Sequence, residues 1–296
     1  LDRDGPAGTF DEWIYAFHMP LFFFLSGLFA GSARKKSIPA FFGGRLRGIA
    51  YPYFVWILIT GVIRTLVYSG PNETVQFLAG YWRVVFEPYD IYWFLYALFL
   101  ISVVYYFLRR AGVSVLAIAV ALLIVYAGFV LSGVEFSWKP ANLFCYYAPY
   151  YAVGTLFTNR SWHASLSGLS TAVRAVLAGA ALALVAYLAL AGMLTAGKPD
   201  IFSATAGILA VIIISMGLER WGKADFIRRW GTLSLQIYVA HTIVGAGVRV
   251  VLLQSGISAL APHIVAGVVI ALLAPILLYH VGNRVGFPYL FSLRRS

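Results

Sequence analysis

The sequence has very few charged residues for its length. Asp, Glu, Lys and Arg together make up 11% of its 296 residues, whereas they make up about 25% of an average soluble domain. Hydrophobic residues account for 61% of the chain, and the mean hydropathy is +0.83. So little polar surface cannot cover a water-soluble globule. The composition therefore predicts a protein that lies in the lipid bilayer and crosses it several times.

Cysteine is also scarce, and acidic residues are half as numerous as basic ones. Cys145 is the only cysteine, which excludes a disulfide within the chain and a cysteine-based metal cluster. We expect no metal cofactor. The net charge of +11 sits in short loops between apolar runs, without a basic patch interleaved with aromatic residues and without a long basic tail. We therefore expect no nucleic-acid partner and interpret this charge as the feature that orients the chain in the membrane.

Long apolar runs dominate the rest of the sequence. A transmembrane helix needs about 20 mostly apolar residues, and helices are the default because each satisfies its own backbone hydrogen bonds within the bilayer. The strict alternation of β-barrel strands is not seen. We predict an all-α, polytopic transmembrane helix bundle that forms a single membrane domain over residues 1–296. Its expected spans lie at about 13–31, 50–69, 91–108, 112–131, 142–158, 172–194, 201–218, 233–254 and 263–283, nine in all.

The loops between these runs alternate in their content of Lys and Arg. Sixteen of the 22 basic residues lie in five segments, which are residues 32–49, 109–111, 159–174, 219–230 and 284–296. Cytoplasmic loops of membrane proteins are enriched in Lys and Arg, so we expect these five segments in the cytoplasm. This places the C-terminus inside and residue 1 outside.

The eighth run carries a stripe of polar side chains. Ser234, Tyr238 and His241 are spaced i, i+4 and i+7, which puts all three on one face of a helix. A second histidine, His18, lies a few residues into the first run from the outer side. Ionisable groups inside a bilayer usually face a bundle interior or a water-filled cavity and mark functional sites. The alternative is an interhelical hydrogen-bond ladder that holds the bundle together, and the residues alone favour neither interpretation.

A dense group of basic residues precedes the second run. Arg45 and Arg47 lie just before it, and Lys35 and Lys36 lie in the loop upstream. Guanidinium groups bind phosphate in a bidentate manner, so this basic group is a candidate site for a phosphorylated cytosolic ligand. No Walker-type Gly-Lys-Ser/Thr accompanies it, so it is not a P-loop. On spacing alone, further orienting charge is the favoured interpretation.

The outer rim of the third run combines acids with aromatic rings. Glu87, Asp90 and Trp93 lie within this rim. Carboxylates beside aromatic faces can hold a sugar through its hydroxyls and by stacking, and we include Tyr238 among the candidate substrate contacts. Tyr and Trp at a membrane interface usually form only the aromatic belt, and this simpler interpretation is favoured.

Four stretches of the chain resemble, in the same order, the acyltransferase family 3 membrane proteins. Residues 17–27, Phe-His-Met-Pro-Leu-Phe-Phe-Phe-Leu-Ser-Gly, resemble the second-helix signature of that family. Residues 45–52 resemble its following Arg-x-x-Arg-x-x-Pro-like element, although the arginines here are two apart. Residues 93–98 resemble its Trp-Phe-Leu segment, and residues 234–241 resemble its late helix with Ser, Tyr and His. Each stretch alone is a weak match. Together the four stretches occur in the order and at the spacing of the family, and they extend over most of the chain.

The resemblance implies an integral membrane O-acyltransferase. Such proteins move an acyl group, commonly acetyl, from cytosolic acetyl-CoA or another acyl-CoA onto a hydroxyl of a glycan or another cell-envelope molecule. It implies a bacterial cytoplasmic membrane protein in which the basic group before the second run holds the CoA phosphates. His241 and Ser234 would line the path of the acyl group or acceptor, with His18 orienting groups from the outer side.

The resemblance also bears on the first helix. The family has about ten transmembrane helices with both ends in the cytoplasm, and its first helix carries the principal catalytic histidine. Nine expected spans with an outer N-terminus correspond to that fold without its first helix, and residues 1–16 do not match its pattern. We therefore expect the chain to begin after that helix, to be without the principal histidine, and to be inactive alone.

Two other functional classes stay open at this point. A transporter or flippase of a sugar or lipid-linked substrate would also be a polytopic bundle with scattered intramembrane charge, and Pro20 and the many glycines could break helices near a midplane site. No inverted repeat supports it. A non-catalytic family member is the third class. The acceptor, the acyl chain length, the side on which transfer occurs and the oligomeric state are not predicted.

Overall fold

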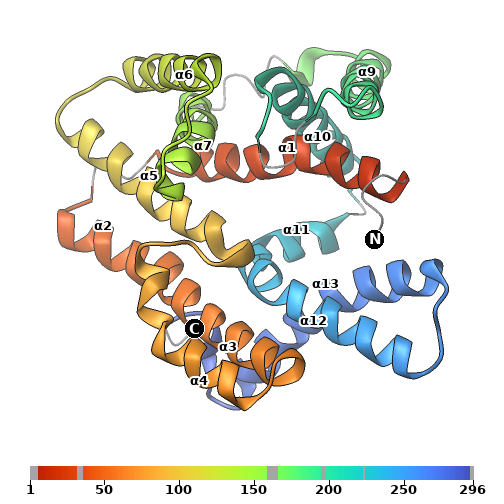
Figure 1. The fold of residues 1–296 in the computed structure, drawn as a ribbon. Coiled ribbons are helices and arrows are strands. Elements are labelled where there is room, and N and C mark those ends of the chain that lie inside the picture. The colour runs from red at the N-terminus through yellow and green to blue at the C-terminus, as the bar shows by residue number, and fades with distance from the viewer. Residues whose placement is uncertain (1–5, 32–35, 159–165, 195–197, 223, 294–296) are drawn as a thin grey trace. The chain divides into compact units, whose positions relative to one another are not determined.

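The computed structural model describes residues 6–31, 36–158, 166–194, 198–222 and 224–293. Within these ranges the regular secondary structure is entirely helical (Figure 1), which confirms the predicted all-α class. Backbone contacts divide the chain into two compact units. Unit 1 comprises residues 1–37 and 97–224, and unit 2 comprises residues 38–96 and 225–296. The assignment of the whole chain to a single domain stays a prediction.

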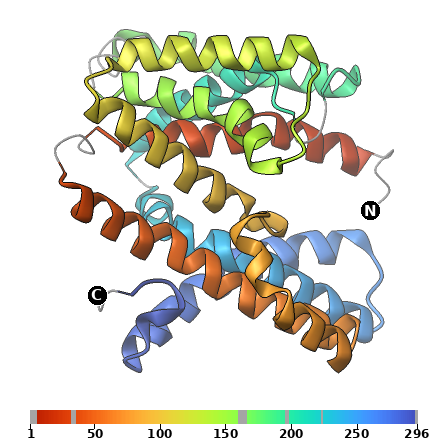
Figure 2. The same cartoon turned by 60° about the vertical axis from the view of Figure 1, so that its left-hand side comes forward.

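Unit 1 is organised around two central helices. Its helices include α1 (Pro6–Leu28), α6 (Val115–Ser132), α7 (Lys139–Leu156), α9 (Thr171–Leu190), α10 (Ile201–Trp221) and the greater part of α5 (Trp93–Arg110). Helix α1 contacts α7, α9 and α10, and α7 also contacts α6. Figure 2 shows α1 and α7 side by side, and these two helices form the interior of the unit.

Small residues allow α1 and α7 to approach closely. A Cβ atom on Gly27 would clash with the carbonyl oxygen of Tyr151, and one on Gly154 would clash with the carbonyl oxygen of Phe24. Close backbone contact at glycine is a common way to pack helices in a membrane, where dispersion replaces the hydrophobic effect as the driving force. Beside this contact the rings of Phe23 and Tyr147 stack with their centroids 4.9 Å apart.

Each of the nine expected spans coincides with a helix, but not all of these helices are equally apolar. Seven helical stretches among the described residues are long and apolar enough to cross a membrane, and α1 and α7 are not among them. Helix α1 contains His18 and Pro20, and α7 is rich in tyrosine. An interior helix meets protein instead of lipid, so it can carry more polar groups. The number of nine spans stays a prediction.

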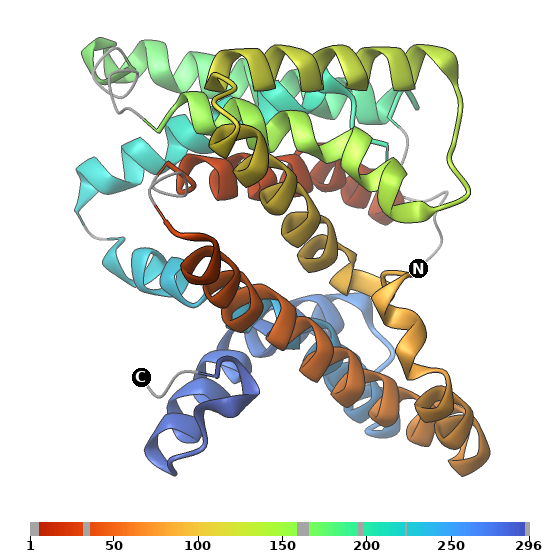
Figure 3. The same ribbon diagram turned by 90° about the vertical axis from the view of Figure 1, so that its left-hand side faces the viewer.

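Unit 2 combines one long helical run with a helical hairpin. Its elements are α2 (Ile38–Arg45), η2 (Leu46–Ala50), α3 (Tyr51–Tyr68), α4 (Pro71–Ala79), η3 (Tyr81–Val85), η4 (Asp90–Tyr92), α11 (Asp225–Thr232), α12 (Ser234–Gln254), α13 (Leu260–Arg284) and η5 (Pro288–Leu290). Helices α12 and α13 pack against each other, and α12 also contacts α3. Figure 3 shows α2, η2 and α3 as one continuous run.

The segment between the second and third expected spans is more structured than a loop. Residues 70–90 contain α4, which begins at Pro71, and the 3-10 helix η3. The ring of Phe77 from α4 fills the space beside Gly61 of α3, where a Cβ atom would clash with it. This contact holds the segment against α3, and it therefore positions the acidic and aromatic rim at residues 87–93.

Candidate functional site

The two predicted phosphate-binding arginines lie at an irregular turn of one helix. Arg45 ends α2, and Arg47 lies in the π-helical turn η2 just before Pro52. Proline has no N–H to donate to the carbonyl four residues earlier, which explains why the regular hydrogen-bond pattern is interrupted here. Single π-helical turns are rare and are frequently found at functional sites.

Both guanidinium groups have neutral partners on the same helical run. The Nε atom of Arg47 donates to the carbonyl of Gly43 at 2.9 Å. The guanidinium of Arg45 lies over the ring of Phe41, 5.4 Å from its centroid. Lys36 is exposed and belongs to unit 1, and the predicted partner Lys35 lies outside the described residues. The phosphate clamp stays a prediction.

A buried tyrosine that the sequence did not single out joins three elements of unit 2. The hydroxyl of Tyr92 donates to the carbonyl of Val239 in α12 at 2.9 Å. Because that donation uses its proton, Tyr92 accepts the hydrogen bond from Thr60 of α3, at 2.6 Å. The Tyr92 side chain is fully buried. In the sequence, only its position one residue before Trp93, in a rim of acids and aromatics, could have pointed to Tyr92.

Tyr238 lies beside this junction and contacts the same rim. Its hydroxyl donates to the carbonyl of Ile91, and its ring meets that of Phe94 edge to face with centroids 5.3 Å apart. Tyr238 therefore lies next to Ile91 and Phe94, the neighbours of Asp90 and Trp93 in the sequence, and the substrate role of these residues stays a prediction. Its phenol proton is already committed to a backbone carbonyl, which gives Tyr238 a role in holding α12 against the rim.

His241 lies one turn further along α12 and is half-buried. Its Nδ1 atom is 2.7 Å from the carbonyl oxygen of Tyr238 and 3.2 Å from that of Ile237. A carbonyl only accepts hydrogen bonds, so Nδ1 carries the proton and the neutral ring has its lone pair on Nε2. This tautomer suits Nε2 for accepting a proton. Ser234, on the same helix, is exposed at its first position.

The acidic residues of the rim differ in their surroundings. The carboxylate of Asp90 pairs with Arg64 of α3 at 3.3 Å, and both side chains are about half exposed. Asp90 also has a positive φ of 44°, which Asp adopts more readily than most residues. Glu87 is exposed, and Trp93 is half-buried at the start of α5. The rim therefore presents Glu87 to solvent while Asp90 is paired with Arg64.

His18 lies in unit 1 and His241 lies in unit 2. The Nδ1 atom of His18 is 3.1 Å from the carbonyl oxygen of Ile14, and its ring meets Tyr15 edge to face at 4.6 Å. His18 is half-buried near the middle of α1. Across the part of the chain that the structure describes, no group of three or more His, Cys, Asp or Glu residues is placed to hold a metal ion.

Comparison with known families identifies the class of protein. The family model described as an acyltransferase domain matches residues 4–280, which is almost the whole chain and includes both units. The chain therefore belongs to acyltransferase family 3. Its apolar helices and its family together define an integral membrane protein. No curated protein and no solved structure matches the chain.

Proposed function

We propose that the protein transfers an acyl group from acyl-CoA, with acetyl-CoA as the expected donor, to a hydroxyl of a glycan or another cell-envelope molecule. The observation that carries this proposal is the family match over residues 4–280. In the reaction the acceptor oxygen forms an ester bond with the acyl carbon, the carbon–sulfur bond of the thioester breaks, and the proton of the hydroxyl ends on the thiol of CoA.

His241 is the best-placed proton acceptor among the predicted site residues of unit 2. The carbonyl of Tyr238 holds its Nδ1–H, so Nε2 has the free lone pair. A neutral imidazole is well suited to moving a proton near pH 7. Because the resemblance gives the principal base to the family's first helix, we assign His241 a supporting role. In this role it lines the path of the acyl group or the acceptor, with Ser234 on the same helix.

Arg45 and Arg47 are proposed to bind the phosphates of CoA. Their present partners, an aromatic ring and a backbone carbonyl, are neutral. A phosphate carries the opposite charge and can accept two parallel hydrogen bonds from one guanidinium, which neither a ring nor a single carbonyl can do, so a phosphate would displace these partners. The Lys and Arg distribution predicts that this turn lies in the cytoplasm, where acyl-CoA is found.

The test uses the full encoded protein in lipid nanodiscs. It is incubated with radiolabelled acetyl-CoA and envelope glycans, and the label is followed into the glycan fraction. Incorporation that requires the protein supports the proposal. The proposal would be overturned if no acceptor became labelled and the protein also failed to bind acetyl-CoA.

A transporter or flippase is the second candidate. Prolines lie inside α1, α7 and α13, at Pro20, Pro149 and Pro275, and interrupted helices are typical of transporter binding sites. Accumulation of a labelled sugar or lipid-linked sugar in proteoliposomes without acyl-CoA would favour this candidate over acyl transfer.

A further inference from the structure

Unit 1 contains a polar cavity at one end of its helices, separate from the residues considered above. It has a volume of about 280 Å³ and lies between the end of α6, the first half of α7 and the segment that leads into α10. Its lining includes two carboxylates, one ammonium group and two phenols, from Glu135, Asp200, Lys198, Tyr126 and Tyr146. A cavity with aromatic walls and convergent polar groups is typical of a small-molecule site.

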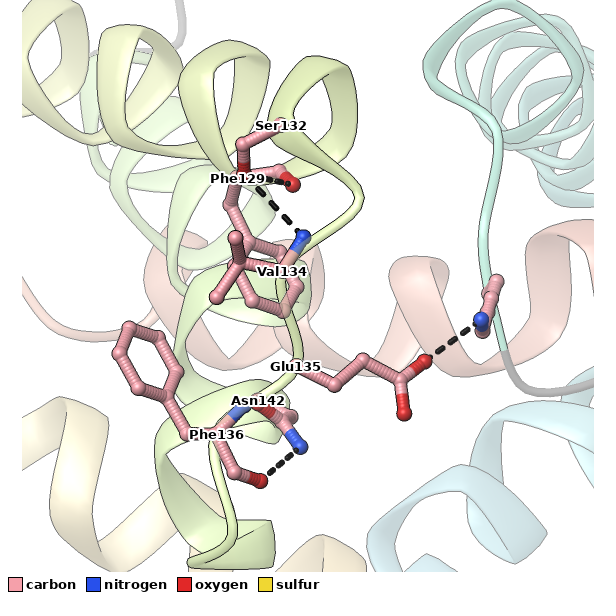
Figure 4. Close-up of polar contacts among 7 residues, drawn as sticks. Phe129, Ser132, Val134, Glu135, Phe136 and Asn142 are labelled. Atoms are coloured by element: carbon pink, nitrogen blue, oxygen red, sulfur yellow. Dashed lines mark hydrogen bonds and ion pairs between the residues drawn. The ribbon is translucent and has the colours of Figure 1, made fainter.

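Two residues of the cavity lining form an ion pair. The Oε1 atom of Glu135, in the loop after α6, is 2.6 Å from the Nζ atom of Lys198, in the segment before α10. Both side chains are about half exposed, so a ligand can reach them. The hydrogen bond that Lys198 donates to Glu135 raises the pKa of Lys198, and its ammonium group is charged at neutral pH. Figure 4 shows Glu135 extending away from α6 and α7 to this contact.

The loop that carries Glu135 is held in place on both sides. Asn142 of α7 accepts the N–H of Phe136 at 2.8 Å and donates to its carbonyl at 2.9 Å (Figure 4). The rings of Phe136 and Phe129 stack with centroids 5.8 Å apart. Gly133 ends α6 with a φ of 63°, a left-handed conformation that glycine adopts without strain. These contacts of Phe136 and the turn at Gly133 hold the backbone on both sides of Glu135.

The opposite wall is also anchored. The hydroxyl of Tyr126 in α6 donates to the carbonyl of Pro199 at 2.7 Å. The Oδ2 atom of Asp200 accepts the N–H of Ser203 at 2.8 Å and caps α10. A carboxylate has about four acceptor sites, so this bond leaves Asp200 able to accept hydrogen bonds from a ligand.

We propose that this cavity binds one neutral sugar ring of the acceptor glycan. The proposal rests on the proposed acyl transfer and names the charge class of the acceptor. Carboxylates accept hydrogen bonds from sugar hydroxyls, the ammonium group donates to them, and tyrosine rings pack against the C–H face of a sugar. The volume lies just below the range of roughly 300–1,000 Å³ for drug-sized ligands, so it suits a single ring.

The charge of the cavity gives the selectivity. Two carboxylates against one ammonium group leave a net negative charge, which repels a sugar that carries a carboxylate. Glu135, Lys198 and Asp200 also lie between expected spans, on the side that the Lys and Arg distribution predicts to be outside the cytoplasm, where envelope glycans are found.

The test measures sugar binding without any acyl donor. Saturation-transfer difference NMR on the full encoded protein in nanodiscs is recorded with maltose and, separately, with glucuronic acid. We expect maltose to bind and glucuronic acid to bind at least tenfold more weakly. Glu135→Gln and Lys198→Met should each weaken maltose binding by about tenfold, the effect of one hydrogen bond to a charged group. Glu73→Gln, at an exposed acid of α4 in unit 2, should leave maltose binding unchanged.

The outcomes separate this site from the proposed function. Label transfer from acetyl-CoA to glycan, with no maltose signal from the same preparation, would overturn the sugar site and leave acyl transfer intact. Maltose binding that depends on Glu135, with no label transfer to any acceptor, would support the site and count against acyl transfer. Equal binding of glucuronic acid would overturn the proposed selectivity.

Discussion

The hydroxyl of Tyr92 donates to the backbone carbonyl of Val239 at 2.9 Å, although the two residues are 147 positions apart in the chain. The same hydroxyl accepts from Thr60 at 2.6 Å. One buried phenol therefore ties η4 to α3 and α12. It also places the α12 turn that carries Tyr238 and His241 beside the acidic and aromatic rim.

Removal of this hydroxyl should destabilise unit 2. In Tyr92→Phe the carbonyl of Val239, inside α12, keeps only its helical hydrogen bond, and the hydroxyl of Thr60 loses its buried partner, which costs about 1–3 kcal/mol. We expect a lower midpoint of denaturant unfolding in detergent. Tyr68→Phe, at an exposed tyrosine on α3, is the matched control. Equal midpoints for the two variants would show that the junction contributes nothing to stability.

The close contact of α1 and α7 should not tolerate a methyl group. Gly154→Ala places a Cβ atom against the carbonyl of Phe24, a backbone atom that cannot move without shifting a helix, and overpacking of this kind costs about 1–3 kcal/mol. We expect a lower thermal unfolding temperature. Gly128→Ala on α6 meets open space and should be neutral; a similar loss in both variants would contradict the prediction.

The arginine pair should affect the affinity for the acyl donor. Arg45→Gln combined with Arg47→Gln removes two charges, and we expect the KM for acyl-CoA in the full encoded protein to rise by about tenfold or more, since each hydrogen bond to a charged group contributes about 1.5–3 kcal/mol. Arg284→Gln, at an exposed arginine at the end of α13 expected on the same side, controls for general electrostatic attraction. Unchanged kinetics in the double variant would exclude the phosphate clamp.

His241 and His280 offer a matched pair for the proton-transfer role. Each ring has Nδ1 near the carbonyl of the residue four positions earlier, at 3.2 Å in His241 and 2.7 Å in His280. If Nε2 of His241 moves a proton, His241→Asn should lower kcat by roughly 10²-fold, whereas His280→Asn, at an exposed position on α13, should not. Equal kcat values in single-turnover assays of the two variants would assign His241 a purely structural role.

The positions of the long helices could be predicted from the sequence. All nine expected spans coincide with helices, and Ser234, Tyr238 and His241 share α12 as expected. The segment at 70–90, between two expected spans, forms α4 and η3, which the apolar runs did not predict. Its helices are short, and the contact of Phe77 with Gly61 that holds them joins two different elements, which a local pattern does not contain.

The membrane fold is determined by the sequence alone because of one physical constraint. In a bilayer each helix satisfies its backbone hydrogen bonds internally, so the length and hydropathy of a run are enough to define it. The four motif stretches likewise identified acyltransferase family 3, which the match to residues 4–280 shows.

Only the tertiary structure decided which polar side chains meet. Glu135 and Lys198 are separated by 63 positions and form an ion pair in the lining of a cavity, and neither was singled out from the sequence. Tyr92, Thr60 and Val239 come from three separate segments. These contacts depend on how the helices pack against one another. In lipid, helix packing depends on close contact and interhelical hydrogen bonds. Both require two surfaces that fit each other, which the composition of either helix alone does not determine.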